Sequence, residues 1–282
     1  MGGLDEFSKL SIDDQKRYRA TSSQMTKFAR DHAIPIAFAP PIGRFAVPVG
    51  EGKVGMVTVP LSLGSIAGAT GCILRLQTGL YVVTAEHVLK CYEERVYQGE
   101  KLDWIVGRLR FDPLQRERAL WRGSCKHQPK DIVFIEVLER EAEEACAGRT
   151  NLVSASTGWP AAAPEVGQTV LLAGYPNELR ETDNGVVKPG SVSVRLEVTT
   201  QTGDGTFKCR LEYSELLSFD EQPVPMKELR ANVGGMSGGP VFAVEAICYP
   251  FVGVITQRGG GFGDFDNIVI EAVEGVSSSF PI

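Results

Sequence analysis

The sequence predicts an all-β protein that begins with a helical segment, and three observations indicate this. Short stretches of alternating apolar residues recur from about residue 54 onward, and each ends in the glycine and polar residues typical of turns. Residues 4–31 instead carry apolar side chains at helical spacing. The segment from Ala33 to Gly55 contains four prolines, which favour an extended connector. The strand pattern by itself fits either a barrel or a sandwich.

The N-terminal helix has a start signal at Ser11, which is followed three residues later by Asp14. One interpretation of its apolar stripe is a helix packed on the outside of the barrel. The alternative is a segment that docks a regulatory partner or inhibits the site. The stripe consists of Ile12, Tyr18, Met25 and Phe28.

The predicted strands form two groups. Between them, residues 139–147 predict an acidic, solvated helix, and residues 159–164, rich in alanine and proline, predict a linker. The expected strands lie at residues 54–59, 72–76, 80–84, 104–106, 109–111, 131–138, 168–173, 191–200, 206–213, 239–244, 251–256 and 268–272.

Composition and charge exclude several classes of function. A chain of 282 residues fits two moderate domains or one double-barrel domain. The net charge of −6 argues against nucleic acid or an anionic membrane as a partner. No apolar run predicts a transmembrane helix, and the N-terminus lacks the features of a signal peptide. Six cysteines without a C-x-x-C pair are typical of reduced thiols, so we expect a cytoplasmic protein without a metal or cofactor.

Ser237 lies in the glycine-rich stretch Gly234–Pro240, where a sharp bend would expose its hydroxyl. The N–H groups of Gly235 and Ser237 could point into one hollow, which is what a developing oxyanion requires. The alternative is an ordinary glycine-rich turn that carries a serine. A serine nucleophile also needs a base and an orienting acid.

All three histidines precede Ser237. This excludes the nucleophile elbow of α/β-hydrolases, in which the histidine follows the serine, and it permits the order His, Asp, Ser. His87 directly follows a predicted buried strand, so it is the candidate base. His32 closes the predicted surface helix and His127 lies in a polar loop, and both are expected to be surface histidines.

Asp131 is the candidate acid, because it alone among the aspartates between His87 and Ser237 opens a hydrophobic strand. A carboxylate entering a buried strand is costly without a partner, and the Nδ1–H of a histidine would be such a partner. A surface aspartate at the start of a strand is the alternative.

Together, Tyr81–Val88, Asp131–Ile135 and Gly235–Val241 resemble the histidine, aspartate and serine motifs of trypsin-like (chymotrypsin-fold, S1-type) serine peptidases, nearest to bacterial and HtrA-type members. Leu172–Pro176 also resembles a strand and turn of the second barrel of that family. The resemblance covers roughly residues 60–265. It implies two six-stranded antiparallel β-barrels, with residues 1–55 as helical extension and connector, 56–158 as the first barrel and 159–282 as the second.

Two positions depart from the family. Met236 stands where digestive members carry an aspartate that receives a freed N-terminus, so that form of activation is not expected. Cys72 lies where many members begin a disulfide near the histidine, but the residue after His87 is Val88. Cys91 is the nearest candidate partner for Cys72, and whether the two pair stays open.

The resemblance also places a substrate pocket. It implies that Ala231 lies at its base, that Asn232 also binds substrate, and that Thr256, Gln257 and Arg258 form one wall, with the Thr256 hydroxyl steadying the aspartate. Residues 259–263 would edge this pocket, or form a plain hairpin. The expected preference is for a small or uncharged residue before the scissile bond. An acidic residue paired with Arg258 is the alternative.

The expected function is therefore a serine endopeptidase that acts on protein or peptide substrates. A catalytically silent module that binds peptides on the same fold is the alternative. In a third interpretation, a protein partner bound through the N-terminal helix orders the oxyanion hole and switches the peptidase on.

Overall fold

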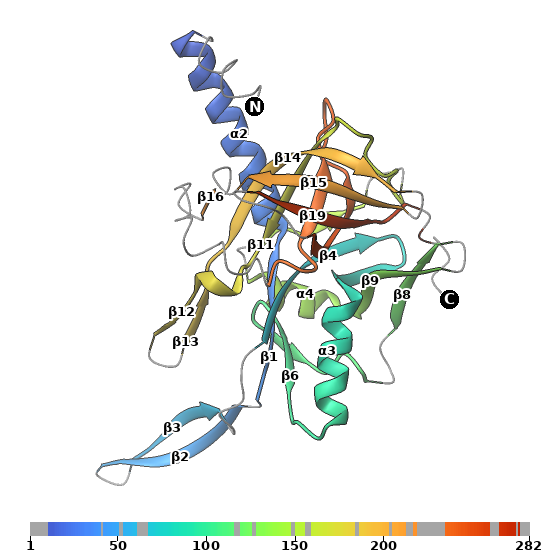
Figure 1. The fold of residues 1–282 in the computed structure, drawn as a ribbon. Coiled ribbons are helices and arrows are strands. Elements are labelled where there is room, and N and C mark those ends of the chain that lie inside the picture. The colour runs from blue at the N-terminus through green and yellow to red at the C-terminus, as the bar shows by residue number, and fades with distance from the viewer. Residues whose placement is uncertain are drawn as a thin grey trace.

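Two β-sheets make up most of the structure, with helices beside them (Figure 1). This confirms the all-β fold class predicted from the sequence. The structure is a computed structural model, and it describes residues 11–40, 42–50, 53–60, 67–115, 119–125, 128–147, 150–155, 159–183, 186–202, 205–212, 217–218, 235–259, 265–274 and 276.

The first sheet has the strand order β7-β6-β1-β4-β5-β9-β8 and forms a half-barrel, with β10 pairing in parallel with β4. Its other pairings are antiparallel, as expected for strands joined by short connections. Its strands are β1 (Ile34–Ala39), β4 (Ala67–Leu76), β5 (Gly79–Thr84), β6 (Asp103–Val106), β7 (Leu109–Phe111), β8 (Leu120–Cys125), β9 (Gln128–Val137) and β10 (Val153–Ser154).

The second sheet closes into a barrel. Its order is β11-β17-β18-β19-β15-β14-β16, and an additional pairing of β11 with β14 joins the first six of these strands into a ring. Its strands are β11 (Thr169–Gly174), β14 (Val192–Gln201), β15 (Thr206–Glu212), β16 (Leu217–Ser218), β17 (Pro240–Ala243), β18 (Phe251–Gly259) and β19 (Phe265–Ala272).

Three apolar cores hold this arrangement together: one inside each sheet and one between the two. On β5, Val82 faces the core of the first sheet, whereas Tyr81 and Val83 face the core shared with the second. Successive residues of a strand point to opposite faces, so a strand buried on both faces is apolar throughout. The unbroken run Tyr81–Val83 therefore reflects the position of β5 between two cores.

The N-terminal helix α2 (Ile12–His32) begins directly after Ser11, as predicted, and packs against β11, β14 and β17 of the second barrel. Met25 and Phe28 lie partly buried against the core shared by the two sheets. Figure 1 shows the N-terminal part of the helix extending beyond the barrel. The interpretation of a helix on the outside of the barrel is thus confirmed for its C-terminal half.

His32 is not the surface residue that the sequence predicts. It is 8% exposed, and its Nδ1 lies 2.7 Å from the carbonyl oxygen of Phe28. Its ring also packs against Phe28 and Phe242, because the last turn of α2 is pressed onto the barrel. Burial lowers the pKa of His32 below its ordinary value, although the Phe28 carbonyl and Asp31 act in the opposite direction.

The remaining elements partly match the predictions. The helix expected at residues 139–147 forms over Glu139–Cys146, but it is not the solvated helix predicted, because Ala142, Ala145 and Cys146 are buried in the core of the first sheet. The helix directly after β5 was not expected. Ile34–Ala39 belongs to the first sheet as β1, although the sequence places it in the connector, because its alternate residues fill the core of that sheet. His127 and residues 260–264 lie outside the described residues.

The elements outside the two large sheets are α3 (Glu86–Tyr97), α4 (Glu139–Cys146), the 3-10 turn η1 (Asn177–Leu179), and the hairpins β2 (Ile42–Gly50) with β3 (Lys53–Pro60) and β12 (Arg180–Asp183) with β13 (Val186–Pro189).

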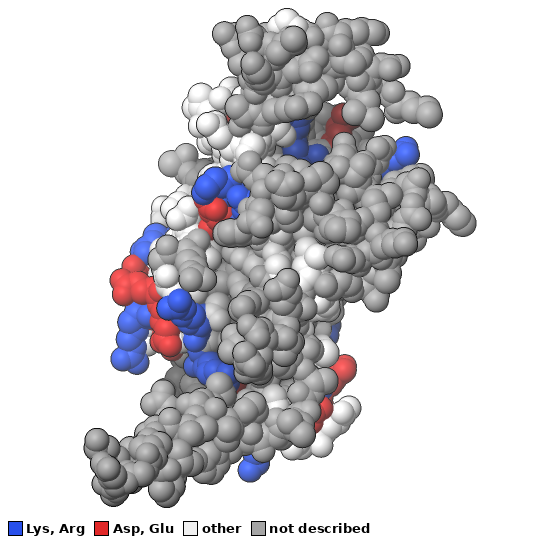
Figure 2. All heavy atoms as spheres, turned by 90° about the vertical axis from the view of Figure 1, so that its left-hand side faces the viewer, with Lys and Arg blue, Asp and Glu red and all other residues white. Residues whose placement is uncertain are grey.

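Charge is mixed on the face shown in Figure 2, where lysine and arginine lie among aspartate and glutamate rather than in a patch of one sign. Within the part of the chain that the structure describes, no helix has the length and apolar character needed to cross a membrane.

Candidate active site

The antiparallel register of β5 and β9 brings His87 and Asp131 together. Thr84 pairs with Val133 in this register. His87 lies three residues beyond Thr84, and Asp131 lies two residues before Val133. In an antiparallel pair, the residues that follow Thr84 on one strand and those that precede Val133 on the other lie at the same end of the pairing. The base and the acid expected from the sequence are therefore neighbours because of strand pairing.

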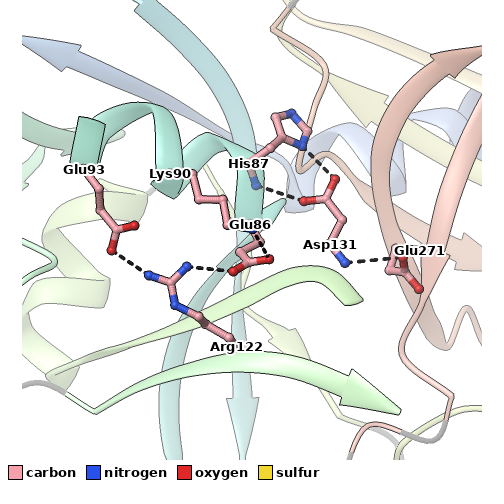
Figure 3. A network of polar contacts seen from close by, with 7 residues as sticks. All are labelled: Glu86, His87, Lys90, Glu93, Arg122, Asp131 and Glu271. Atoms are coloured by element: carbon pink, nitrogen blue, oxygen red, sulfur yellow. Dashed lines mark hydrogen bonds and ion pairs between the residues drawn. The ribbon is translucent and has the colours of Figure 1, made fainter. Parts of the chain in front are cut away.

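Two hydrogen bonds join the pair. Nδ1 of His87 lies 2.7 Å from Oδ2 of Asp131, and the backbone N–H of His87 donates to Oδ1 at 2.9 Å (Figure 3). An ionised carboxylate can only accept, so Nδ1 carries the proton and Nε2 of the neutral ring can act as a proton acceptor. The His87 side chain is 45% exposed, which leaves it accessible from solvent.

The pKa of Asp131 lies below its ordinary value. Burial raises it, but the hydrogen bonds from the side chain and backbone of His87 and the charges of His87 and Lys90 together outweigh burial. The carboxylate therefore stays ionised at neutral pH. An ionised partner is what an imidazole needs in order to take up a proton.

Glu86, the residue before His87, anchors the start of α3. Its side chain is 10% exposed, and it accepts hydrogen bonds from Arg122 on β8 at 2.7 Å and from Lys90 at 3.0 Å (Figure 3). Arg122 also donates to Glu93, at 2.6 Å. A carboxylate in the first turn is further favoured by the helix dipole. The ion pairs fix the helix turn from which His87 projects.

The turn that carries Ser237 is held at several points along its backbone. The Gly238 N–H donates to the carbonyl of Ile255 at 2.6 Å, and the Gly239 N–H donates to that of Met236 at 2.8 Å. The Met236 side chain is buried in the core of the second barrel. The apolar residue at the position of the family's aspartate thus serves as a packing anchor for the serine turn.

This turn lies against the strand that leads to His87. Gly238 has φ +85°, and a Cβ added there would lie 2.0 Å from Oγ1 of Thr84 and 2.1 Å from the carbonyl oxygen of Thr70. Thr84 is three residues before His87, so Ser237 is brought to the same edge as the His87–Asp131 pair. Among the described residues, no hydrogen bond joins Ser237 to His87.

Gly235 and Ser237, the two residues expected to supply the oxyanion donors, both lie in the described turn. Gly235 has φ +95°, and a Cβ there would meet the carbonyl of Tyr175 at 2.6 Å, so the backbone needs glycine. Neither the Gly235 N–H nor the Ser237 N–H donates to another described residue. Successive N–H groups of a turn can form a concave anion-binding nest, which is the arrangement that an oxyanion hole requires.

The predicted pocket is described only in part. Ala231 and Asn232 lie outside the described residues. Gln257 and Arg258 lie on β18, paired with Val269 and Ile268 of β19. The Thr256 hydroxyl, expected to steady the aspartate, instead donates to the Val269 carbonyl at 3.4 Å, because Thr256 is buried between β18 and β19.

Three further residues around this site were missed by the sequence analysis: Thr70, Glu86 and Glu271. Thr70 lies inside β4, two residues before the apolar run that begins at Cys72, and the sequence around it carries no signal for its contacts. Glu86 adjoins His87, but its partner Arg122 is 36 residues away. Glu271 meets Asp131 only across the two sheets, at a separation of 140 residues.

The described cysteines are free thiols, so Cys72 and Cys91 do not pair. Cys72 is buried and Cys91 exposed, and α3 carries Cys91 to the outer surface. Among the described side chains, no group of three or more potential ligands is arranged to hold a metal ion.

No family model matches the chain, and no curated protein does. Solved structures with a similar fold include the protease Anisep from Arthrobacter nicotinovorans, with 14% identity and TM-score 0.44 over 88% of this chain and 92% of that one. A thermostable serine protease, AL20, from an extremophilic microorganism matches with 14% identity and TM-score 0.41 over 86% and 91%. Human heparin binding protein matches with 13% identity and TM-score 0.43 over 89% and 90%.

The half-barrel and the closed barrel match the predicted chymotrypsin-like two-barrel fold. The second barrel has the expected six strands, whereas the first half is an eight-stranded half-barrel rather than a closed six-stranded one.

Proposed function

We propose that the chain is a serine endopeptidase that hydrolyses peptide bonds of protein substrates through His87, Asp131 and Ser237. The observation that carries the proposal is the doubly hydrogen-bonded His87–Asp131 pair, which lies at the strand end against which the Ser237 turn packs. The two N–H groups of the turn that have no acceptor in the described chain add support, because acyl transfer develops negative charge on an oxygen.

In the proposed reaction, Nε2 of His87 accepts the hydroxyl proton of Ser237 while Oγ forms a bond to the substrate carbonyl carbon. The carbonyl oxygen becomes negative and accepts hydrogen bonds from the N–H groups of Gly235 and Ser237. The C–N bond then breaks, and His87 gives the proton to the leaving amine. A water molecule, deprotonated by His87, attacks the acyl carbon; the acid leaves, and Ser237 regains its proton.

Asp131 orients the His87 ring in this mechanism and stabilises the imidazolium that forms. Its lowered pKa suits this role, because the carboxylate does not compete for the proton. By analogy with the same change in the His-Asp-Ser template, replacing Asp131 with Asn should lower kcat by about 10⁴-fold.

The test is the intact mass of the protein after exposure to a fluorophosphonate probe. Wild type should gain one probe and Ser237→Ala none, whereas His87→Ala should react about 10⁶-fold more slowly, by analogy with triad deletions. Circular dichroism of each variant controls for folding. Profiling with a peptide library would then separate a preference for small residues before the scissile bond from a preference for acidic ones.

If folded wild type remains unlabelled, the active peptidase is contradicted for the isolated chain. Labelling that appears only after a protein partner is added would support the partner-completed oxyanion hole. Peptide binding with no labelling under any condition would support the silent binding module instead.

A further inference from the structure

Thr70, on β4 of the first sheet, forms hydrogen bonds to the turn that carries Ser237 in the second half of the chain. The residue is 0% exposed. Its backbone N–H donates to the Ser237 carbonyl at 2.9 Å, and its hydroxyl donates to the Gly235 carbonyl at 2.6 Å. The hydroxyl also accepts a hydrogen bond from the Tyr175 N–H at 2.9 Å, and its carbonyl accepts one from the Thr84 hydroxyl at 2.7 Å.

The direction of the Thr70 hydroxyl proton is fixed by these partners. A hydroxyl has one proton to donate, and the Tyr175 N–H occupies one of its acceptor positions. The proton is therefore directed to the Gly235 carbonyl. A chain of donors and acceptors of this kind strengthens each of its members in a buried environment.

The two bonds from Thr70 hold both ends of the segment that carries the proposed oxyanion donors. Fixing the Gly235 carbonyl fixes the peptide plane that follows Gly235, and fixing the Ser237 carbonyl fixes the plane that follows Ser237. The Met236 carbonyl between them is bound by the Gly239 N–H. Three consecutive peptide planes are therefore held. The Ser237 N–H lies in the middle plane, and the Gly235 N–H lies in the plane just before the first, which joins it at the Gly235 Cα.

We propose that Thr70 is a positioning residue that aligns the oxyanion hole through its hydroxyl. This inference rests on the proposed peptidase function and adds a residue to it. Thr70 does not touch the substrate. It acts through Gly235 and Ser237, and it does so from the first half of the chain, so that the geometry of the hole depends on how the two halves meet.

The test compares Thr70→Val, which keeps the shape and removes the hydroxyl, with Thr70→Ser, which keeps the hydroxyl. We expect Thr70→Val to lower kcat and the rate of fluorophosphonate labelling by about 10- to 100-fold, since small misplacements at a reacting centre have effects of this size. KM should change by less than about threefold, because the oxyanion forms only after the substrate has bound. Thr70→Ser should retain kcat within about threefold of wild type.

A matched control is Thr26→Val on α2. Thr26 is also buried, and its hydroxyl donates to the carbonyls of Ser22 and Ser23, away from the serine turn. This variant should lose stability without a change in kcat, which separates a general effect of losing a buried hydroxyl from an effect on the oxyanion hole.

The inference is overturned if folded Thr70→Val reacts at the wild-type rate, or if its loss appears in KM rather than in kcat. It is also overturned if Thr70→Ser, which should fold even where Thr70→Val does not, loses as much activity as a Thr70→Ala variant. Failure of wild type itself to react with the probe would contradict the proposed function, so the two failures are distinguishable.

Discussion

Nζ of Lys130 lies 3.1 Å from Oε1 of Glu271, in an ion pair that joins β9 of the first sheet to β19 of the second barrel. The two side chains are only 3% and 9% exposed. Lys130 also donates to the Ala272 carbonyl at 2.8 Å, and Oε2 of Glu271 lies 3.4 Å from the backbone N of Asp131 (Figure 3). The residue next to the proposed catalytic aspartate is thus tied to the other half of the molecule.

Replacing Lys130 with Met should lower the free energy of unfolding by about 3–5 kcal/mol, because the buried Glu271 carboxylate would lose its ion pair with Lys130. The double variant Lys130→Met/Glu271→Leu should recover most of this loss. The measurement is urea unfolding of the three proteins. Arg75→Met serves as the control: it breaks an exposed pair with Glu139 and should cost less than about 1 kcal/mol. Equal losses for Lys130→Met and Arg75→Met would contradict the role of burial.

Gly238→Ala should destabilise the protein far more than Gly99→Ala. Both glycines have positive φ, +85° and +90°, so both substitutions carry the cost of about 1–2 kcal/mol for a left-handed backbone. At Gly99 nothing lies within 4 Å of an added Cβ, whereas at Gly238 Thr84 and Thr70 lie within 2.1 Å. Urea unfolding of the two variants gives the comparison, and similar losses would show that the serine turn can move away from β4 and β5.

The contribution of Asp131 to stability should vanish in acid. Its folded-state pKa is lowered, so its stabilisation is fully present above the unfolded value of about 3.9 and is lost as the pH falls through the folded value. The difference in unfolding free energy between wild type and Asp131→Asn should therefore shrink as the pH is lowered from about 5 toward about 2. Urea unfolding at several pH values measures this difference. A difference that grew as the pH fell would mean that folding raises the pKa of Asp131 instead of lowering it.

The reactivity of the free thiols toward iodoacetamide should depend on their burial. Cys72 and Cys209 are buried, and burial raises the pKa of both, that of Cys209 to about 12, so neither forms the reactive thiolate in the native state. Cys91 and Cys248 are exposed and should react with iodoacetamide, with Cys248 held back because its hydrogen bond to Glu245 raises its pKa. Peptide mapping by mass spectrometry before and after unfolding tests this. Native labelling of Cys72 at the rate of Cys91 would be contrary to the structure.

Local patterns in the sequence located many of the strands, although not β1 or β2, and they indicated the three residues proposed to act in catalysis. Alternating apolar residues located β11, β14 and β19, and the strand beginning at Asp131 identified its carboxylate as one that needs a partner. These features depend on neighbours within a few residues, which a single sequence contains.

Contacts between distant segments could not be predicted in this way. Nothing near Lys130 indicates that its partner is Glu271, and nothing near Thr70 indicates that its hydroxyl will meet Gly235, 165 residues away. The burial of His32 has the same origin: its polarity suggests a surface position, but the packing of α2 on the second barrel determines its environment.

The hydrogen bonds from Thr70 to the serine turn also bear on the order in which the chain is made. His87 and Asp131 belong to the half that is synthesised first, whereas Ser237 and its turn belong to the half that follows, and the turn is held by a strand of the first half. In the proposed peptidase, a nascent chain would therefore carry a base and an acid but no nucleophile. Cleavage would begin only after the second barrel has folded and docked onto the first half.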